Sequence, residues 1–196
     1  MLVVSRYEPL LLLTIFIDSF TTEQVYLRLD TGSSDSWIVR KGFECLANEF
    51  VFKVDPAVCK FGPTYNGTFQ GGQISDQNFG IKYLDDSFVT GVLGYSDITV
   101  AGNKVTHQEI ALVDRAYMVG DGLSSGILGL AYEYMTSAHL GTNPGLDSPT
   151  EGNAPGDTVH YSPIVQTMIA QGLNPRMFSV ALQRSTIADQ YVPGGE

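Results

Sequence analysis

The sequence predicts an all-β protein that contains one or two short helices. Short apolar, β-branched or aromatic runs alternate with turn residues along the chain, which is typical of strands joined by tight connections. Turn formers are frequent, with 21 glycines and 9 prolines, whereas a single segment carries clear helix signals. Hydrophobic residues make up 43% of the 196 residues, so the chain can bury a sizeable core and is not disordered as a whole.

Seven strands are expected from these runs. They are residues 10–17, 25–29, 36–40, 79–84, 88–100, 105–113 and 177–183. The first run, LLLLTIFI, has eight residues, whereas a transmembrane helix needs roughly 20. Glu8 and Pro9 stand where a signal peptide would be basic, and no small-residue cleavage site follows. We therefore expect a buried strand here, with no membrane span and no evident signal peptide.

One helix is expected over residues 162–172. Ser162 can cap its start, Pro163 suits the first helical position, and Gly172 can end it. Residues 141–156 are rich in Gly, Pro, Asn, Asp and Ser without periodicity, which predicts a surface loop before the helix.

Charge and cysteine content exclude several classes of function. The 11 Lys and Arg against 21 Asp and Glu give a net charge of −10, which repels phosphate backbones and anionic lipid, so no nucleic-acid partner is expected. Two cysteines are too few for a four-cysteine zinc site. The histidines His107, His139 and His160 lie far apart without ligand spacing, so no metal site is expected either.

The segment most informative about chemistry is residues 25–39, VYLRLDTGSSDSWIV. An alternating strand runs into Asp-Thr-Gly, then two serines and a tryptophan before a second apolar strand. Gly32 permits a turn at the strand end that would present the Asp30 carboxylate. The hydroxyls of Thr31 and Ser33, with backbone N–H groups, can hold that carboxylate in place. A chance Asp-Thr-Gly in a hairpin turn is the alternative interpretation, and the flanking strand and tryptophan argue against it.

With this motif, the sequence resembles the pepsin-like aspartic proteases, in particular the secreted or cell-wall fungal members. Further segments match in the order of that family, and the resemblance covers residues 10–196. They are a flap-like hairpin at 79–97, the segment SGILGLAY at 125–132, a helix end and strand at 171–182, and a cysteine loop before residues 61–68. The resemblance implies an acid-protease lobe built as a closed or partly open β-barrel.

The resemblance also implies roles for individual residues. Asp30 would be one of two catalytic aspartates that share a proton and activate a water molecule. Tyr83 would be the flap tyrosine, with the Trp37 indole N–H donating a hydrogen bond toward it. Substrate contacts are expected from Thr31, Gly32, Ser33, Tyr83, Asp85 and Ile127. Burial behind the catalytic turn is an equally good interpretation for Ile127, and a solvated hairpin tip for Asp85.

A second catalytic aspartate is not found in the sequence. Two carboxylates about 3 Å apart cannot both ionise, and the chemistry uses this pair as acid and base. Asp121 and Asp147 each lack part of the Asp-Thr/Ser-Gly pattern that follows a strand. We therefore expect residues 1–196 to form a single amino-terminal lobe, whose partner is the carboxy-terminal lobe of the same parent chain.

Other residues carry expectations about the compartment and the cleft. Cys45 and Cys59 resemble a disulfide loop of fungal members, with two free thiols as the alternative. Asn66 begins the one Asn-x-Ser/Thr sequon, so glycosylation and a secretory route to a secreted, cell-wall or vacuolar location are expected. Leu84 stands where the flap usually has glycine, so its Cβ is expected to restrict the turn and narrow the cleft.

Taken together, the sequence predicts an aspartic-type endopeptidase that hydrolyses polypeptides beside bulky apolar residues at acid pH. No cofactor is expected, because water is the nucleophile. One alternative is a catalytically inactive, protease-derived lobe that binds peptide or a partner protein. Another is a homodimer in which each chain supplies Asp30, although this lobe is larger than single-lobe proteases.

Overall fold

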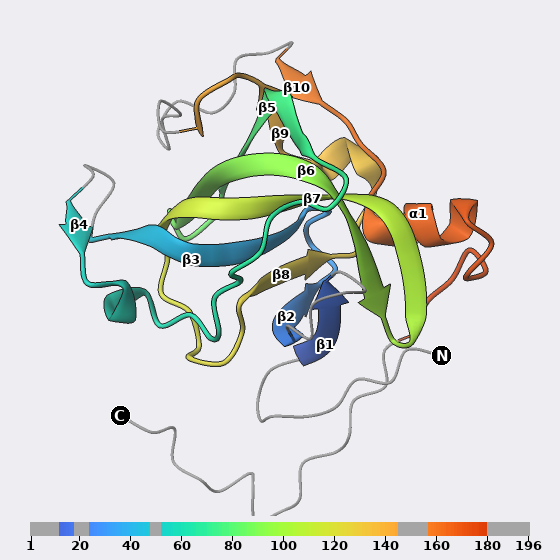
Figure 1. Ribbon diagram of the computed structural model, residues 1–196, viewed down its shortest axis with the longest axis horizontal. Coiled ribbons are helices and arrows are strands. Elements are labelled where there is room, and N and C mark those ends of the chain that lie inside the picture. The colour runs from blue at the N-terminus through green and yellow to red at the C-terminus, as the bar shows by residue number, and fades with distance from the viewer. Residues whose placement is uncertain (1–11, 18–23, 48–51, 145–156, 180–196) are drawn as a thin grey trace, which may run out of the picture.

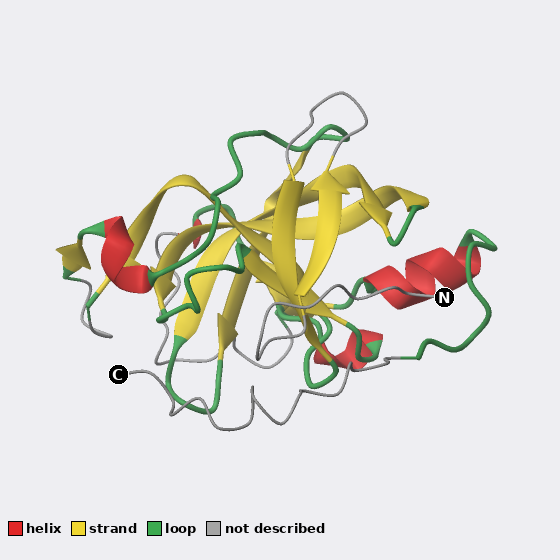
Figure 2. Ribbon diagram, turned by 90° about the horizontal axis from the view of Figure 1, so that it is seen from below, coloured by secondary structure: helices red, strands yellow, loops and turns green. Residues whose placement is uncertain are grey.

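The fold is a single mixed β-sheet with short helical segments around it. The computed structural model describes residues 12–17, 24–47, 52–144 and 157–179. Within these residues, ten strands pair in the order β1-β2-β8-β3-β7-β6-β5-β9-β10, with β4 attached to β3 (Figure 1). The helical segments lie outside the strands (Figure 2). The predicted all-β class with few helices is confirmed.

The strands have the following bounds. They are β1 Leu12–Ile17, β2 Gln24–Asp30, β3 Ser36–Leu46, β4 Lys53–Val54, β5 Gln73–Lys82, β6 Phe88–Val100, β7 Asn103–Tyr117, β8 Gly126–Gly129, β9 Ala138–Leu140 and β10 Thr158–Val159. The described helical segments are the 3-10 turns η1 Pro56–Cys59 and η2 Glu133–Met135 and the α-helix α1 Ile164–Ala170.

The strand β8 lies between two strands that precede it by a long stretch of chain. It runs parallel to β2, with Asp30 opposite Gly129. It runs antiparallel to β3, with Trp37 opposite Ile127. The end of β2, the start of β3 and the whole of β8 are therefore neighbours, and the turn that joins β2 to β3 lies against the end of β8.

The sheet folds back on itself but stays open. The strand β1 pairs with β2 and also with the end of β6, where Ile15 lies opposite Val100. Beyond β6, the sheet continues through β5, β9 and β10. Of the two expected forms, closed or partly open, the structure has the open one.

Strands β6 and β7 form a long hairpin with a tight turn. Ala101 and Gly102 join them, with φ angles of 50° and 81°. Two successive positive φ angles are what a two-residue type I′ turn requires, because its twist matches that of the strands. Gly102 adopts this conformation freely, whereas Ala101 adopts it against its own preference.

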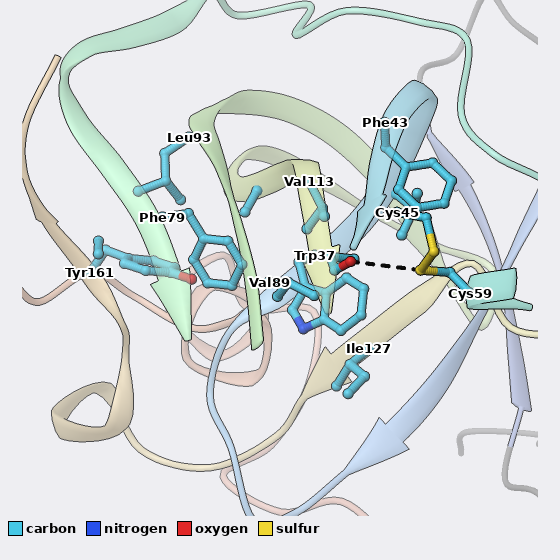
Figure 3. Packing of buried hydrophobic residues seen from close by; sticks show 14 residues of the cluster. Trp37, Phe43, Cys45, Cys59, Phe79, Val89, Leu93, Val113, Ile127 and Tyr161 are labelled. Atoms are coloured by element: carbon cyan, nitrogen blue, oxygen red, sulfur yellow. Dashed lines mark hydrogen bonds between the residues drawn. A yellow bond between two sulfur atoms is a disulfide. The ribbon is translucent and has the colours of Figure 1, made fainter. Parts of the chain in front are cut away.

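Residues that alternate along the central strands form two apolar clusters. On β3, Ile38 belongs to one cluster, and Trp37 and Val39 belong to the other. Such alternation with burial on both sides means that both faces of β3 are covered. Figure 3 shows the second cluster, in which side chains from β5, β6, β7 and β8 surround the Trp37 indole.

Most expected strands are present, and several extend beyond the sequence pattern. The strand expected at 79–84 begins earlier than predicted, at Gln73. Its first part, residues 73–78, was not predicted because these residues are largely polar and show no apolar alternation. The short strands β4, β8, β9 and β10 were not among the expected strands, since two to four residues carry no periodicity. Of the strand expected at 177–183, residues 177–179 are not strand, and the remainder lies outside the described residues. Of the loop predicted at 141–156, residues 141–143 lie outside helices and strands.

The predicted helix is present as α1, but its start differs from the expectation. Pro163 occupies the N-cap and no side chain caps the helix, so the cap expected from Ser162 is wrong. The end is as predicted, with Gly172 at φ 70°. Gln171 exchanges two hydrogen bonds with the backbone of Thr106, at 2.7 and 3.1 Å, and so ties the end of the helix to β7. No helix in the described part of the chain is long and apolar enough to cross a membrane.

The predicted disulfide joins Cys45 on β3 to Cys59 at the end of η1. The Asp55 side chain starts η1 by accepting a hydrogen bond from the Ala57 N–H at 2.9 Å. Both sulfur-bearing residues are almost fully buried in the cluster around Trp37. The disulfide therefore fastens the segment after β3 to the core.

Reduction of this disulfide is expected to lower the free energy of unfolding by about 3 kcal/mol, because the closed loop restricts the unfolded chain. The sequence separation is 14 residues, and the chain has no other cysteines, so a reductant has no second target. Urea titrations of oxidised and reduced protein measure the difference. Equal urea midpoints, or free thiols in unreduced peptides by mass spectrometry, would contradict the expectation.

Candidate active site

The Asp30 carboxylate is presented at the end of β2 by the turn that follows it. The Gly32 N–H donates to Oδ1 at 2.8 Å, and the Ser33 hydroxyl donates to Oδ2 at 2.6 Å. A Cβ on Gly32 would lie 3.3 Å from Oδ1, so a larger residue would crowd this oxygen. Each carboxylate oxygen thus accepts one hydrogen bond from the turn, and the carboxylate remains only half-buried.

The predicted role of Thr31 in holding the carboxylate is wrong. Its side chain is exposed, and within the described residues its hydroxyl makes no hydrogen bond. Gly32 and Ser33 supply the holding contacts instead, because the turn directs their N–H and hydroxyl toward Asp30.

The turn is fixed from behind by the segment that contains β8. Backbone N–H groups of Leu130 and Ala131 donate to the carbonyls of Asp30 and Ser33 at 2.8 and 3.0 Å. A Cβ on Gly129 would lie 2.4 Å from the Ser34 carbonyl carbon, which is closer than packed atoms allow. The resemblance predicts that residues 125–132 pass behind the turn that carries Asp30, and these backbone hydrogen bonds confirm that position.

The predicted hydrogen bond between Trp37 and Tyr83 is present. The indole Nε1 donates to the Tyr83 hydroxyl at 2.9 Å, across the space between β3 and the hairpin of β5 and β6. Trp37 is 1% exposed, so the bond starts from a rigid point in the core. Burial raises the pKa of Tyr83 well above its ordinary value, against a smaller opposing effect of this hydrogen bond, so the phenol stays neutral.

The tip of this hairpin is closed by its own residues. The Tyr83 N–H donates to the Ser87 carbonyl at 2.8 Å, and the Asp85 carboxylate accepts from the Ser87 N–H and hydroxyl at 3.1 and 2.6 Å. These two hydrogen bonds lower the pKa of Asp85. The positive φ of the turn, 66°, falls on Asp86. Leu84 therefore does not restrict the turn as expected, and its side chain stands fully exposed at the mouth of the cleft.

A cleft of ≈ 1020 Å³ lies between the Asp30 turn and this hairpin. Of the predicted site residues, the following line it: Asp30, Gly32, Ser33, Tyr83, Asp85 and Ile127. Ile127 is also 3% exposed and belongs to the cluster around Trp37, so its burial is observed, whereas its contact with substrate stays a prediction. The disulfide cysteines lie at the wall of the same cleft, whereas Thr31 is not part of its lining.

Asp35 is a buried residue of the site that sequence reasoning missed. It is fully buried and accepts hydrogen bonds from the Tyr161 hydroxyl at 2.6 Å and from the Ser137 N–H at 3.0 and 3.1 Å. Burial raises the pKa of this carboxyl, and the hydrogen bonds oppose that rise. These contacts tie the chain after the Asp30 turn to residues about a hundred positions later. A charged residue between Ser34 and Ser36, at the start of a buried strand, was the available signal.

Glu109 on β7 is a second buried carboxyl near Asp35. Its side chain is 8% exposed. Burial and the charge of Asp35 raise its pKa to about 7, and a hydrogen bond with Tyr95 opposes them. The folded protein therefore holds a proton on Glu109 at acid pH.

The remaining predicted features lie away from the cleft. Asn66 is exposed and is not part of the cleft lining. Its glycosylation stays a prediction. The rings of His107 and His160 pack on Tyr95 and Tyr134. In the described ranges, no three His, Cys, Asp or Glu side chains are grouped so that they could hold a metal ion.

Comparison with known proteins identifies consistent similarities. The family model described as eukaryotic aspartyl protease matches residues 20–195. The chain is 38% identical over 161 residues to a probable aspartic-type endopeptidase of Aspergillus fumigatus, a match that covers 80% of this chain and 33% of that protein. It is 28% identical over 173 residues to rhizopuspepsin-2 of Rhizopus niveus, covering 86% of this chain and 36% of that protein.

A solved structure agrees with the fold. The crystal structure of an aspartic proteinase from Irpex lacteus matches with a TM-score of 0.56 at 18% identity, covering 84% of this chain and 37% of that one. At this identity, the similarity shows the fold alone. The chain spans about a third of the length of the curated relatives it matches.

Replacing Glu109 by Gln is expected to change how stability depends on pH. Because the pKa of Glu109 is raised from 4.5 to about 7 in the folded state, its proton stabilises the fold fully below pH 4.5. That contribution, about 3 kcal/mol, is lost as the pH rises through 7. Urea titrations at pH 4.5, 6 and 8 should show a steeper loss of stability for the wild type than for Glu109→Gln.

The matched control for this experiment is Glu133→Gln, which removes a carboxyl on η2, outside this buried cluster. It should keep the pH dependence of the wild type. If Glu109→Gln also kept it, the raised pKa of Glu109 would be refuted.

Proposed function

The chain belongs to the eukaryotic aspartyl protease family, and on this premise we propose that it is the amino-terminal lobe of a two-lobe aspartic endopeptidase. The observation that carries the proposal is the Asp30 carboxylate, held by Gly32 and Ser33 on the floor of a cleft that Tyr83 faces from the other side. The second carboxyl would come from the carboxy-terminal lobe of the parent chain.

In the proposed reaction, Asp30 and the second aspartate share one proton. The ionised carboxylate takes a proton from a water molecule as that water attacks the carbonyl carbon of the scissile peptide bond. The protonated carboxyl gives its proton to the carbonyl oxygen. Collapse of the tetrahedral intermediate then breaks the C–N bond. The leaving nitrogen takes from the dyad the proton that came from water, and one hydroxyl of the intermediate returns its proton to the dyad, which again holds one shared proton. Water supplies all the atoms added, so no cofactor is required.

The turn contributes to this reaction by restricting the Asp30 carboxylate. The Gly32 N–H and Ser33 hydroxyl hold the two oxygens in one orientation, which removes a rotational freedom that would otherwise be lost in the transition state. Tyr83, oriented by Trp37, would cover the substrate from the hairpin side. Asp85 and Ile127 would contact the peptide from the tip of the hairpin and from β8.

The wall of the cleft supports a polypeptide substrate with apolar side chains. Its apolar lining includes Phe61, Ile81, Leu84, Val119 and Ile127. A cleft of this volume, in which apolar side chains lie around Asp30, suits a polypeptide with apolar side chains.

The disulfide supports a secretory route, because disulfides persist in oxidising compartments. The exposed Asn66 would be available for glycosylation in such a compartment. We therefore propose a secreted, cell-wall or vacuolar protease.

Residues 1–196 alone are expected to show no more than trace proteolysis, because the acid and base roles fall to different carboxyls. Self-association is also expected, because apolar side chains are exposed just after the segment that holds the Asp30 turn. The exposed fractions are 78% for Tyr132, 79% for Tyr134 and 50% for Met135. Size-exclusion chromatography with a peptide-cleavage assay on each fraction measures both. Vigorous cleavage by monomer fractions would contradict the proposal, and cleavage confined to dimer fractions would favour the homodimer.

Replacing Asp30 by Asn in the full-length protein is expected to lower kcat by about a thousandfold or more, since Asn keeps the size but cannot share the proton. Asp55→Asn is the matched control, because the Asp55 carboxylate also accepts a backbone N–H two residues ahead, at 2.9 Å, but lies outside the cleft lining. It should leave kcat unchanged. A fall of less than about tenfold for Asp30→Asn, roughly 1.4 kcal/mol of barrier, would rule out the catalytic role.

A further inference from the structure

The cleft contains a cation that the proposed reaction does not use. Arg28 precedes Asp30 by two positions on β2, so the two side chains lie on the same face of the strand. Arg28 is half-buried, lines the same cleft and lies opposite Ile127 of the neighbouring strand. Arg28 belongs to neither apolar cluster, so packing of the core does not explain a guanidinium at this position.

The carboxylates near Arg28 are held by other groups. Asp30 is held by its turn and Asp85 by its own hairpin tip, as described above. Asp121 accepts from the Ser124 N–H and hydroxyl at 2.6 and 2.7 Å. The charge of Arg28 acts on Asp85 and Asp121 without a direct bond to either. Within the described part of the chain, its guanidinium makes no hydrogen bond or ion pair.

The other cation of the cleft lining near the hairpin tip differs in this respect. Lys82 forms an ion pair with Asp86 at 2.9 Å, on the hairpin itself. Arg28, which also lines the cleft, has no such partner among the residues that the structure describes. A half-buried guanidinium without a partner is unfavourable, and a carboxylate of matching planar geometry relieves this cost by accepting two parallel hydrogen bonds.

We propose that Arg28 is a specificity-determining residue that selects substrates with an acidic side chain at or next to the scissile bond. This inference rests on the proposed function. Positions two apart on a strand are separated by about 7 Å, so a peptide whose carbonyl lies at Asp30 brings a neighbouring side chain within reach of Arg28. The stem of a glutamate would pack on Ile127, and its carboxylate would meet the guanidinium.

The preference should depend on the ionisation of the substrate. A free glutamate side chain ionises near pH 4.3, so the preference for Glu over Gln should grow above that pH and fade below it. The groups of the lobe that face Arg28 are Asp30 on β2, Tyr83 and Asp85 on the hairpin, and Asp121 on the loop before β8. Ionisation of these groups changes the rate of the reaction for both peptides alike. It therefore cancels in the ratio of kcat/KM for the Glu peptide to kcat/KM for the Gln peptide.

The test uses the full-length protein and matched peptides in which one residue on either side of the scissile bond is Glu, Gln or Leu. The measured quantity is the ratio of kcat/KM for the Glu and Gln peptides at pH 3.5 and 5.5. At pH 5.5 the wild type should favour Glu by about 10- to 100-fold. Arg28→Leu should abolish this ratio and favour Leu, and Arg28→Lys should retain part of it. The control Arg176→Leu removes the same charge from an exposed site and should leave the ratio unchanged.

The wild-type ratio decides the inference even if a variant fails to fold. A ratio below about twofold at pH 5.5, with the Gln and Leu peptides cleaved, would overturn the role of Arg28 and leave the proposed function intact. A ratio that survived in Arg28→Leu would also overturn it. Absence of cleavage for every peptide would overturn the proposed function and this inference with it.

Discussion

The close packing of β8 between β2 and β3 is the constraint on which the candidate site depends. Two glycines make it possible: a Cβ on Gly126 would lie 2.0 Å from the Trp37 carbonyl oxygen, and one on Gly129 would lie 2.4 Å from the Ser34 carbonyl carbon. With β8 in place, its backbone and that of the following residues hold the turn after Asp30 from behind. The turn in its place holds the carboxylate through the Gly32 N–H and the Ser33 hydroxyl, so Asp30 has a fixed position while it still lines the cleft.

The same packing fixes the opposite wall of the cleft. Trp37 lies opposite Ile127, and its indole N–H orients Tyr83 at the far side. Rigid contacts thus connect the floor and the covering hairpin through one buried aromatic residue. Arg28 takes no part in these contacts, and its charge is required neither by the fold nor by the shared-proton chemistry. We interpret that charge as the feature by which this lobe discriminates among peptides.

Sequence alone predicted the parts of the structure that depend on local patterns. The turn at Asp30 follows from the residues around it, and the long strands β6 and β7 follow from apolar and β-branched runs bounded by turn residues. Contacts that depend on tertiary packing were not predictable in this way. Asp35 gives no sign in the sequence that Tyr161 will bond to it, and the left-handed residue of the hairpin tip proved to be Asp86, which relieves Leu84 of strain. Ser162 failed as a cap because Pro163 occupies the N-cap.

The most direct test of the central claim is a crystal structure of the full-length protein with a peptide analogue that carries a hydroxyl in place of the scissile carbonyl. The account predicts that this hydroxyl lies about 3 Å from the Asp30 carboxylate and from a second carboxyl outside residues 1–196, with Tyr83 over the ligand. An analogue bound away from Asp30, or one that contacts Asp30 without a second carboxyl, would contradict it.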